Sequence, residues 1–214
     1  YDSADSQKLI SRVMETLNLD SKKYPARQFQ HLISNAKNEL QTPYEYLSKA
    51  TNQFETIVAD VYTMYEKRLK QANALDFDDL IMKTVQVLQQ FPETKARFRS
   101  RFRHILVDEY QDTNLSQYLI ARKLAAVKRN ICVVGDAAQT IYSFAGATDR
   151  FLRDFPRRFP GATQVRLVRD YRSTEPIVAL ANAILVEAGD EAGRLVSQCG
   201  PGPEPEVRDF DDEV

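Results

Sequence analysis

Apolar side chains in the first 73 residues recur every three or four positions. Two runs carry this pattern, namely Leu9, Ile10, Val13, Met14 and Leu17, and then Phe29, Leu32, Ile33, Ala36 and Leu40. This spacing places the apolar side chains on one face of a helix. The segment Thr42-Pro43-Tyr44-Glu45 supplies a cap, a proline for the first turn and an acid three residues after the cap, so it predicts one long helix that runs on to Leu69. Residues 1–73 contain no glycine, and we expect an all-helical subdomain with a small core of its own.

Further along, the pattern changes to short apolar runs that predict strands. Residues 76–79 place acids where another helix begins, and Pro92 stops that helix. Residues 105–107 (Ile-Leu-Val) and 131–134 (Ile-Cys-Val-Val) follow, and such runs are typical of strands buried on both faces of a parallel sheet. Between them, helical spacing links Leu115, Tyr118, Leu119 and Ala125. The pattern therefore predicts the α/β class, with a strand–helix–strand unit in a parallel sheet.

The C-terminal quarter predicts a third strand and one more helix. The strand is residues 165–168 (Val-Arg-Leu-Val). Ser173 or Thr174 then caps a helix that carries Pro176 in its first turn. We expect the buried face of this helix to consist of Ile177, Val178, Ala181, Ile184 and Leu185. From Gly189 onward, the content of glycine, proline and acids is typical of a linker.

Composition restricts the possible environments and partners. The 214 residues are 43% hydrophobic, which indicates a globular protein, and their formal net charge is −1. Because there is no global basic field, any contact with nucleic acid must be local or made by stacking. Cys132 and Cys199 lie far apart, which favours a reducing, cytoplasmic location over a disulfide or a structural zinc. No stretch approaches the roughly 18 apolar residues of a membrane span. The first residue is Tyr1 and not Met, which indicates an excerpt of a longer protein.

The first candidate site is the acid pair at the end of the first strand. Asp108 and Glu109 follow the run directly, and ligands of open α/β sheets bind beyond the carboxyl ends of the strands. Asp108 can hold Mg²⁺, and Glu109 can orient or deprotonate the water that attacks a nucleoside triphosphate. The alternative is an ordinary acidic strand end. Asp112 can cap the next helix as readily as it can do chemistry.

The second candidate site follows the second strand. Gln139 comes just beyond the strand end, where its amide can bind a terminal phosphate oxygen and sense its loss. Tyr142 and Phe144 lie two residues apart near Gly146, and bases stack on such rings at about 1–3 kcal/mol each. The alternative is that both rings belong to the core.

Two further stretches combine cations with aromatic rings. In Asp170-Tyr171-Arg172-Ser173, Tyr171 could stack on an adenine and Arg172 could act on a γ-phosphate as an arginine finger. The alternative there is an ordinary helix start. Residues 95–103 alternate Lys or Arg with Phe98 and Phe102; we expect a solvated basic face, with a phosphate-contacting patch as the alternative.

Taken together, the motifs resemble a known family. Asp-Glu-Tyr-Gln-Asp-Thr-Asn (108–114), Gly-Asp-Ala-Ala-Gln-Thr-Ile-Tyr-Ser-Phe-Ala-Gly-Ala (135–147) and Tyr-Arg-Ser (171–173) closely resemble, in order and spacing, motifs of the UvrD/Rep/PcrA group of superfamily 1 DNA helicases. Leu-Asp-Phe-Asp-Asp-Leu (75–80) is similar to a segment of the same family. The resemblance implies a partial P-loop-NTPase (RecA-like) sheet. It also implies a helical insertion that touches duplex DNA (1–73), part of a first motor domain (74–163), and the start of a second motor domain with a linker (164–214).

The resemblance also assigns cofactors and residue roles. ATP and Mg²⁺ would be the cofactors, with Asp108 and Glu109 as the metal-binding and water-activating pair. Gln139 would contact the γ-phosphate, and Tyr142 and Phe144 would stack on single-stranded DNA. In the third motif, Tyr171 would stack on adenine and Arg172 would be an arginine finger. The chain departs from the family pattern at Ala138, Ala145 and Asp170, where Asp, Arg and Asn are usual.

These observations lead to one expected function and two alternatives. We expect an internal fragment of an ATP-dependent DNA helicase that moves 3′ to 5′ on single-stranded DNA, at duplex junctions, in repair or replication. No Gly-x-x-x-x-Gly-Lys-[Ser/Thr] phosphate loop is present, so we expect the chain alone to be inactive, and to self-associate through unpaired sheet edges. One alternative is a non-catalytic nucleic-acid-binding or interaction module of helicase shape. The other is part of a helicase–nuclease repair subunit.

Overall fold

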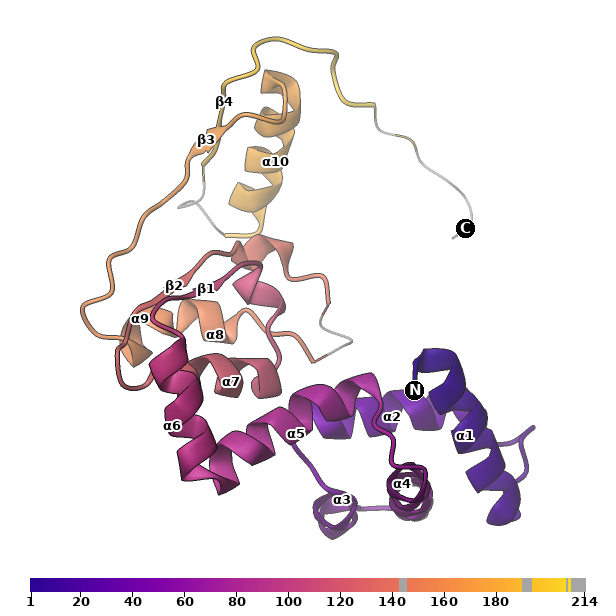
Figure 1. The fold of residues 1–214 in the computed structure, drawn as a ribbon. Helices are drawn as coiled ribbons and strands as arrows, with labels where there is room; N and C mark the ends of the chain where they lie inside the picture. Colours follow the sequence, from indigo (N-terminus) through magenta and orange to yellow (C-terminus); the bar gives the residue numbers. More distant parts are fainter. Residues whose placement is uncertain (143–145, 190–193, 207, 209–214) are drawn as a thin grey trace. The chain divides into compact units, whose positions relative to one another are not determined.

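The structure is a computed structural model that describes residues 1–142, 146–189, 194–206 and 208. It divides into two compact units, unit 1 (Tyr1–Phe159) and unit 2 (Pro160–Val214) (Figure 1). Both units combine helices with a short parallel sheet, so the predicted α/β class is confirmed. The boundary predicted between residues 73 and 74 falls inside unit 1, and it stays a prediction. Among the described residues, no helix has the length and apolar character needed to cross a membrane.

The N-terminal part of unit 1 is helical, as predicted. It contains α1 (Ser3–Thr16), α2 (Ala26–Asn38), α3 (Pro43–Lys49) and α4 (Gln53–Gln71). These helices enclose a core that includes the fully buried Val13, Phe29, Ile33, Val58 and Val61. Each such side chain contributes about 1.5–3 kcal/mol by leaving water. The predicted core of the helical region is therefore present, and its standing as a separate subdomain stays a prediction.

The prediction of a single long helix from Thr42 is wrong, because residues 50–52 are not helical and divide this segment into α3 and α4. Thr42 does begin α3, and its capping box with Glu45 is formed as predicted. However, the Asn52 side chain accepts a hydrogen bond from the Glu55 N–H at 2.9 Å, and Glu55 Oε2 accepts one from the Thr51 N–H at 2.6 Å. This second set of capping bonds starts α4 as a separate helix.

Two helices lead from the helical part to the sheet. Asp76 caps α5 (Phe77–Gln90) and forms a capping box with Asp79, which confirms the predicted start. Phe91 ends α5, and Pro92 opens α6 (Pro92–Arg101). The proline therefore both stops one helix and starts the next.

A buried ion network joins α2, α4 and the start of α5. The Lys37 side chain is fully buried, and its Nζ lies 2.7 Å from Glu66 Oε1, 2.7 Å from Asp76 Oδ2 and 3.1 Å from Asp79 Oδ1. The Tyr65 hydroxyl donates a further bond of 2.8 Å to Asp76 Oδ2. Burial acts to lower the pKa of Lys37, but the three carboxylates outweigh it and raise that pKa. We call this group of five side chains the Lys37 network.

The end of α2 also contacts the helix that follows the 108–114 motif. Asn114 Nδ2 donates a hydrogen bond of 2.8 Å to Asn38 Oδ1, and the Ser116 hydroxyl donates one of 2.9 Å to the Asn38 carbonyl. All three residues are buried. The Asn114 side chain also accepts from the Gln117 N–H and caps α7 (Leu115–Ala125). The cap is thus Asn114, so capping of this helix, one of the two roles left open for Asp112, is wrong.

The sheet of unit 1 confirms the predicted strand–helix–strand unit. β1 (Ile105–Val107) and β2 (Ile131–Val133) pair in parallel, with Leu106 opposite Cys132, and α7 connects them. One face is covered by Tyr110, Tyr118 and Phe151, which pack with side chains that include Val107 and Val133. The three residues belong to η1 (Tyr110–Asp112), α7 and α8 (Arg150–Arg153). In the chain, α9 (Phe155–Arg158) follows α8, and Figure 1 labels both helices.

The prediction that the first strand is buried on both faces is wrong. Leu106 is 78% exposed, whereas its neighbours Ile105 and Val107 are partly buried. Successive side chains of a strand point to opposite faces. The aromatic cluster covers only the face of Val107 and Val133, so Leu106 and Cys132 remain exposed on the other.

Unit 2 is small and differs from the prediction in three places. Residues 165–168 are not a strand; β3 is only Arg169–Asp170, and it pairs in parallel with β4 (Val196–Ser197) in the stretch predicted as a linker. Thr174 lies at the N-cap position of α10 (Glu175–Glu187), as one of the two predicted caps, but its side chain makes no capping hydrogen bond. Of the predicted apolar face of α10, only Val178 is buried. A strand forms only where a second strand pairs with it. The pairing with β4 starts at the end of the 165–168 segment, where the Val196 N–H donates a hydrogen bond to the Val168 carbonyl.

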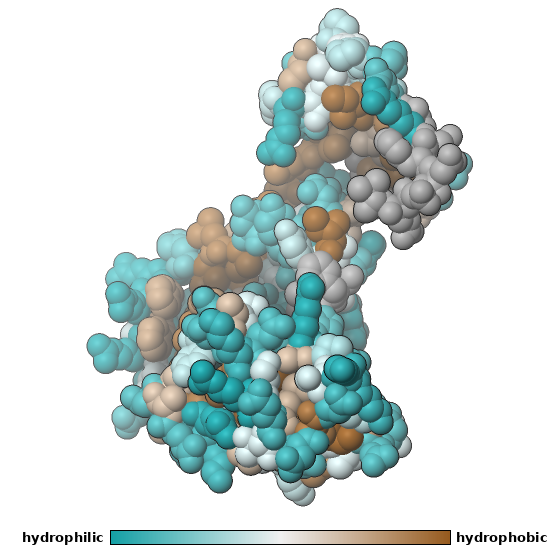
Figure 2. Space-filling model, turned by 90° about the vertical axis from the view of Figure 1, so that its right-hand side faces the viewer, coloured by the Kyte–Doolittle hydropathy of each residue, from teal (hydrophilic) through white to brown (hydrophobic). Residues whose placement is uncertain are grey.

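Figure 2 shows one face of the molecule, mainly hydrophilic with interspersed apolar patches.

The Lys37 network predicts a large effect of removing its single buried cation. Lys37→Met keeps most of the side-chain volume but leaves buried carboxylates without their partner. We expect the free energy of unfolding of unit 1 to fall by about 3–5 kcal/mol in urea titrations. Lys67→Met, at an exposed position of α4, is the control and should change it by less than about 0.5 kcal/mol. Equal effects of the two variants would contradict the role given to Lys37.

The same network predicts sensitivity to acid. Burial raises and Lys37 lowers the pKa of Asp76, and the net result lies below its ordinary value of 3.8. The stabilisation by Asp76 is therefore complete above pH 3.8 and is lost as the pH falls through the lower, folded-state pKa. We expect Asp76→Asn to flatten the loss of stability below pH 3.8 in urea titrations. Asp60→Asn, at an exposed position of α4, should keep the wild-type slope, and an unchanged slope in Asp76→Asn would disprove the assignment.

Candidate nucleotide site

The end of β1 turns sharply and presents two exposed carboxylates. Glu109 has φ +49° and ψ +44°, a left-handed conformation that costs a residue with a side chain about 1–3 kcal/mol. Its N–H donates a hydrogen bond of 3.0 Å to Asp108 Oδ1, and η1 starts at the next residue. Asp108 and Glu109 therefore leave the sheet side by side, as the sequence predicts for this strand end.

The end of β2 forms a second turn beside the first. The Tyr110 N–H donates to the Val134 carbonyl at 2.9 Å, and the Val134 N–H donates to the Val107 carbonyl at 2.8 Å. These bonds continue the pairing of the strands past their last residues. The next residues, Gly135 and Asp136, lead into η2 (Ala137–Gln139). The structure thus brings the 108–112 and 135–139 segments to one edge of the sheet.

Asp136 organises the turn that carries Gln139. Its Oδ1 accepts a hydrogen bond of 3.0 Å from the Ala138 N–H, and its Oδ2 accepts one of 2.9 Å from Gln139 Nε2. Gln139 is exposed at the edge of the sheet. Its predicted contact with a phosphate stays a prediction, and in this structure its amide donates to Asp136.

Gln111 joins the two turns, and the reasoning from sequence gave it no role. It is 1% exposed. Its Nε2 donates to Glu109 Oε2 at 2.8 Å, and its Oε1 accepts from the Asp136 N–H at 3.1 Å. The only signal for it in the sequence is its place inside the 108–114 motif, two residues after Glu109.

The carboxylates suit Mg²⁺ by their chemistry. Asp108 and Glu109 offer hard oxygen ligands, and Mg²⁺ takes one or two carboxylates and completes its shell with water and phosphate. Among the described residues, no cluster of three or more His, Cys, Asp or Glu could enclose a metal by itself. The pair would supply only part of the coordination shell of Mg²⁺, and its binding of the ion stays a prediction.

The predicted DNA-stacking residues are described only in part. Tyr142 is 49% exposed, so it is not a core residue and the alternative interpretation is wrong for this ring. Its carbonyl accepts a hydrogen bond of 3.3 Å from the Ala147 N–H, which draws the two ends of the loop together. Phe144 lies outside the described residues. A contact of either ring with DNA stays a prediction.

The third motif lies in unit 2, where Asp170 shapes its turn. Asp170 Oδ1 accepts hydrogen bonds from the Ser173 N–H at 2.8 Å and the Arg172 N–H at 2.7 Å. These bonds lower the pKa of Asp170. Tyr171 is 71% exposed. Because Tyr171 and Arg172 belong to a different unit from Asp108, their predicted joint site stays a prediction.

The basic segment that includes α6 has an exposed cationic face. Phe98 and Phe102 stack with centroids 6.1 Å apart and are each more than a third exposed. Arg99 Nε donates a hydrogen bond of 2.6 Å to the Lys123 carbonyl. Burial and then the neighbouring cations Lys95, Arg122 and Arg99 lower the pKa of Lys123. The exposure agrees with the predicted solvated basic face, and the alternative of phosphate contacts stays open.

Comparison with known proteins decides the family. The model of the UvrD/REP helicase N-terminal domain matches residues 1–160. The chain belongs to the UvrD/REP helicase family. It is 46% identical over 213 residues to the ATP-dependent DNA helicase UvrD1 of Mycobacterium tuberculosis. The aligned region covers 94% of this chain and 28% of that protein. It is 43% identical over 184 residues to the ATP-dependent DNA helicase PcrA of Leuconostoc citreum, covering 86% of this chain and 25% of that protein. The chain thus spans about a quarter of the length of these relatives.

One departure from the UvrD/REP pattern has a physical explanation. The sequence has Asp170 where Asn is expected from the resemblance. Asn and Asp side chains both accept hydrogen bonds from the backbone N–H groups that follow them, and Asp170 does so twice. The hydrogen bonds of this turn therefore do not require Asn at position 170. Ala138 contributes its N–H to Asp136, which any residue except proline could do, and Ala145 lies outside the described residues.

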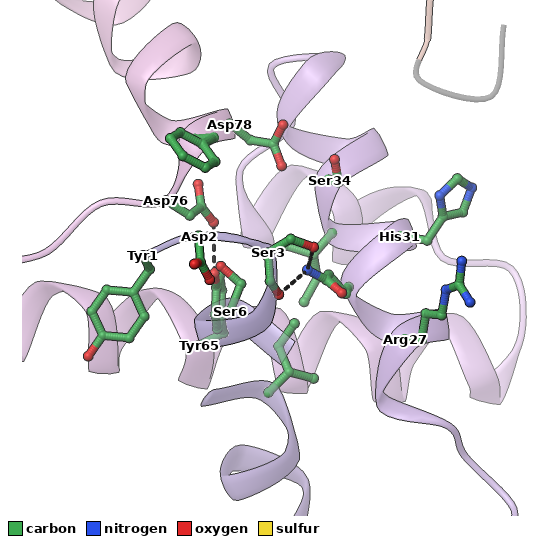
Figure 3. A pocket seen from close by; sticks show the side chains of 14 residues that line it. Tyr1, Asp2, Ser3, Ser6, Arg27, His31, Ser34, Tyr65, Asp76 and Asp78 are labelled. Carbon is green, nitrogen blue, oxygen red and sulfur yellow. Dashed lines mark hydrogen bonds between the residues drawn. The ribbon is translucent and has the colours of Figure 1, made fainter. Parts of the chain in front are cut away.

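A pocket lies elsewhere in this UvrD/REP chain, in the helical part of unit 1 (Figure 3). It has a volume of about 270 Å³, and its lining includes Arg27, His31, Ser34, Asp76 and Asp78. Tyr65 and Asp76 of the Lys37 network also line it, so the pocket lies beside that network, and burial raises the pKa of its Asp78. It contains none of the residues of the three motifs. The strand ends, and not this pocket, are therefore the candidate site.

The contact between the two turns predicts a loss of stability when a side chain is introduced at Gly135. A Cβ at Gly135 would lie 2.6 Å from Gln111 Oε1 and 3.2 Å from both Gln111 N and Leu152 Cδ2. We expect Gly135→Ala to lower the free energy of unfolding by about 1–3 kcal/mol in urea titrations. In a Gln111→Ala background the nearest obstacle is gone, so the same substitution should cost less. Strict additivity of the two substitutions would contradict this explanation.

Proposed function

We propose that this chain is part of an ATP-dependent DNA helicase that couples Mg-ATP hydrolysis to 3′–5′ movement on single-stranded DNA. The observation that carries the proposal is the arrangement at the strand ends, where Gln111 links the Glu109 carboxylate to the turn of Asp136 and Gln139. Family membership supports it, because the similar UvrD1 and PcrA proteins are ATP-dependent DNA helicases by name. Cytoplasmic action in repair or replication belongs to the same proposal.

Each residue of the site has a role that its geometry permits. Asp108 would hold Mg²⁺ on the nucleotide phosphates, and the ion would neutralise charge that develops as the terminal phosphate leaves. Glu109, held on one oxygen by Gln111, would orient the attacking water and accept its proton. Gln139 would exchange its bond to Asp136 for one to the terminal phosphate. A phosphate loop, absent from this sequence, would hold the β- and γ-phosphates.

The remaining motif residues would connect hydrolysis to DNA. Tyr142 and Phe144 would stack on bases, and Tyr171 and Arg172 would meet the adenine and the γ-phosphate when the motor domains close. The half-exposed ring of Tyr142 and the exposed ring of Tyr171 support these roles. The exposed Leu106 and Val134 support self-association of the chain in isolation.

ATP hydrolysis by two lengths of the protein tests the proposal. We expect no ATPase from this chain and clear activity from the longer gene product in which a phosphate loop precedes it. In the longer protein, Glu109→Gln should lower kcat by at least about 100-fold, because general-base catalysis is lost. Glu93→Gln, at an exposed position of α6, is the control and should keep the wild-type rate. Hydrolysis by this chain alone, or full activity of Glu109→Gln, would refute the proposal.

Binding of labelled single-stranded DNA by the longer protein tests the proposed contact between Tyr142 and DNA. Tyr142→Ala should weaken binding by about five- to 150-fold, which corresponds to a stacking energy of about 1–3 kcal/mol. Tyr44→Ala is a matched control, because Tyr44 is 80% exposed and lies outside the motifs. Equal affinities of the two variants would remove Tyr142 from the DNA-binding surface.

A further inference from the structure

Gln111 is a buried amide whose donor and acceptor are both engaged at the strand ends. Its Nε2 bonds Glu109 Oε2 at 2.8 Å and lies 3.4 Å from Asp112 Oδ2, while its Oε1 accepts from the Asp136 N–H at 3.1 Å. With 1% exposure, water has little access to compete for these bonds. Glutamine is suited to this position because a single side chain supplies both a donor and an acceptor.

The hydrogen bonds of Gln111 continue into the turn of Gln139. Asp136 presents its N–H to Gln111 and its Oδ2 to Gln139 Nε2, which donates at 2.9 Å. A continuous series of hydrogen bonds therefore runs from the Glu109 carboxylate through Gln111 and Asp136 to Gln139. It connects the ends of two neighbouring strands through side chains, in addition to the backbone pairing of the sheet.

The surroundings hold Gln111 in this one place. The backbone bonds from Tyr110 to Val134 and from Val134 to Val107 fix the two strand ends. Gly135 lets the strand approach so closely that a Cβ there would lie 2.6 Å from Gln111 Oε1. Gly135 does not have a positive φ, so this close approach, and not backbone conformation, is what requires a glycine.

We propose that Gln111 is a positioning residue. It couples the position of the Glu109 carboxylate to the turn after β2, in which Gln139 would contact the terminal phosphate. This inference rests on the proposed function. When Gln139 leaves Asp136 for a phosphate, Gln111 still ties Glu109 to the Asp136 backbone. The water-activating group and the phosphate-sensing turn then move as one unit, and the carboxylate is aligned only when that turn is in place. A misplacement of about 1 Å can cost about 100-fold in rate.

Two substitutions separate the hydrogen bond that Gln111 donates to Glu109 from the one that it accepts from the Asp136 N–H. Gln111→Met keeps the length and bulk of the side chain but loses both hydrogen bonds. Gln111→Glu keeps an acceptor for the Asp136 N–H and loses the donor to Glu109. Gln89→Met, at an exposed position of α5, is the control for replacing a glutamine.

The first readout needs no activity and uses this chain. We expect hydrogen–deuterium exchange of the Asp136 amide to be at least tenfold faster in Gln111→Met and near wild type in Gln111→Glu. The second readout is ATP hydrolysis by the longer protein that contains a phosphate loop. Both variants should lower kcat about 10- to 100-fold and leave KM for ATP within about twofold. Gln89→Met should match wild type in both readouts.

The outcomes distinguish failure of this inference from failure of the proposed function. If Gln111→Met exchanges faster at the Asp136 amide but keeps the wild-type kcat, the hydrogen bonds of Gln111 have no role in positioning Glu109. This result would overturn the inference and leave the proposed function standing. A rise in KM equal to the fall in kcat, together with lower thermal stability, would indicate a structural role and would also overturn it. No hydrolysis by the wild-type longer protein would refute the proposed function, and this inference with it.

Discussion

The buried ammonium group of Lys37 is the interaction on which the arrangement of unit 1 depends. It lies among carboxylates from α4 and from the start of α5, at distances from 2.7 to 3.1 Å. A buried ion is costly unless it is paired, so α2, α4 and α5 have one mutual arrangement in which the single ammonium group lies within reach of all three carboxylates. Apolar packing alone permits small shifts between helices. A buried cation with three carboxylate partners permits very few shifts between the helices, because each shift moves a carboxylate away from the ammonium group.

The same part of α2 extends this order towards the candidate site. Asn38, next to Lys37, bonds Asn114, and its carbonyl accepts from Ser116. Asn114 is the last residue of the 108–114 motif, in which two exposed residues are followed mainly by buried ones. Asp108 and Glu109 are exposed and available for chemistry, whereas Tyr110, Gln111, Thr113 and Asn114 are buried and fix the segment to its surroundings. The proposed catalytic pair is thus placed by the residues that follow it, and those residues are held in turn by the end of α2.

The sequence was sufficient for the features that are local. Helical spacing identified α1, α2 and α7, the apolar runs identified β1 and β2, and the motifs identified the acids at the strand end. It failed where the outcome depends on a distant partner. Lys37 follows Ala36 in a helical pattern, where a lysine ordinarily faces solvent, and its partners Glu66, Asp76 and Asp79 lie 29 to 42 positions further on. Residues 165–168 have the alternation of a strand, but β3 pairs only at Arg169–Asp170. Similarly, the apolar character of Leu106 does not reveal that only the other face of its strand is covered.

Gly135 and Gln111 show why a site can be identified from motifs while its internal connections are not. Read separately, Gly135 is a turn residue and Gln111 a polar residue between two acids. In the structure they constrain each other, since the amide oxygen occupies the space that any side chain at position 135 would need. The glycine brings the Asp136 N–H within 3.1 Å of Gln111, and Gln111 in turn reaches Glu109. The position of the proposed water-activating carboxylate therefore depends on a residue 26 positions away in the sequence, through a contact that neither motif contains by itself.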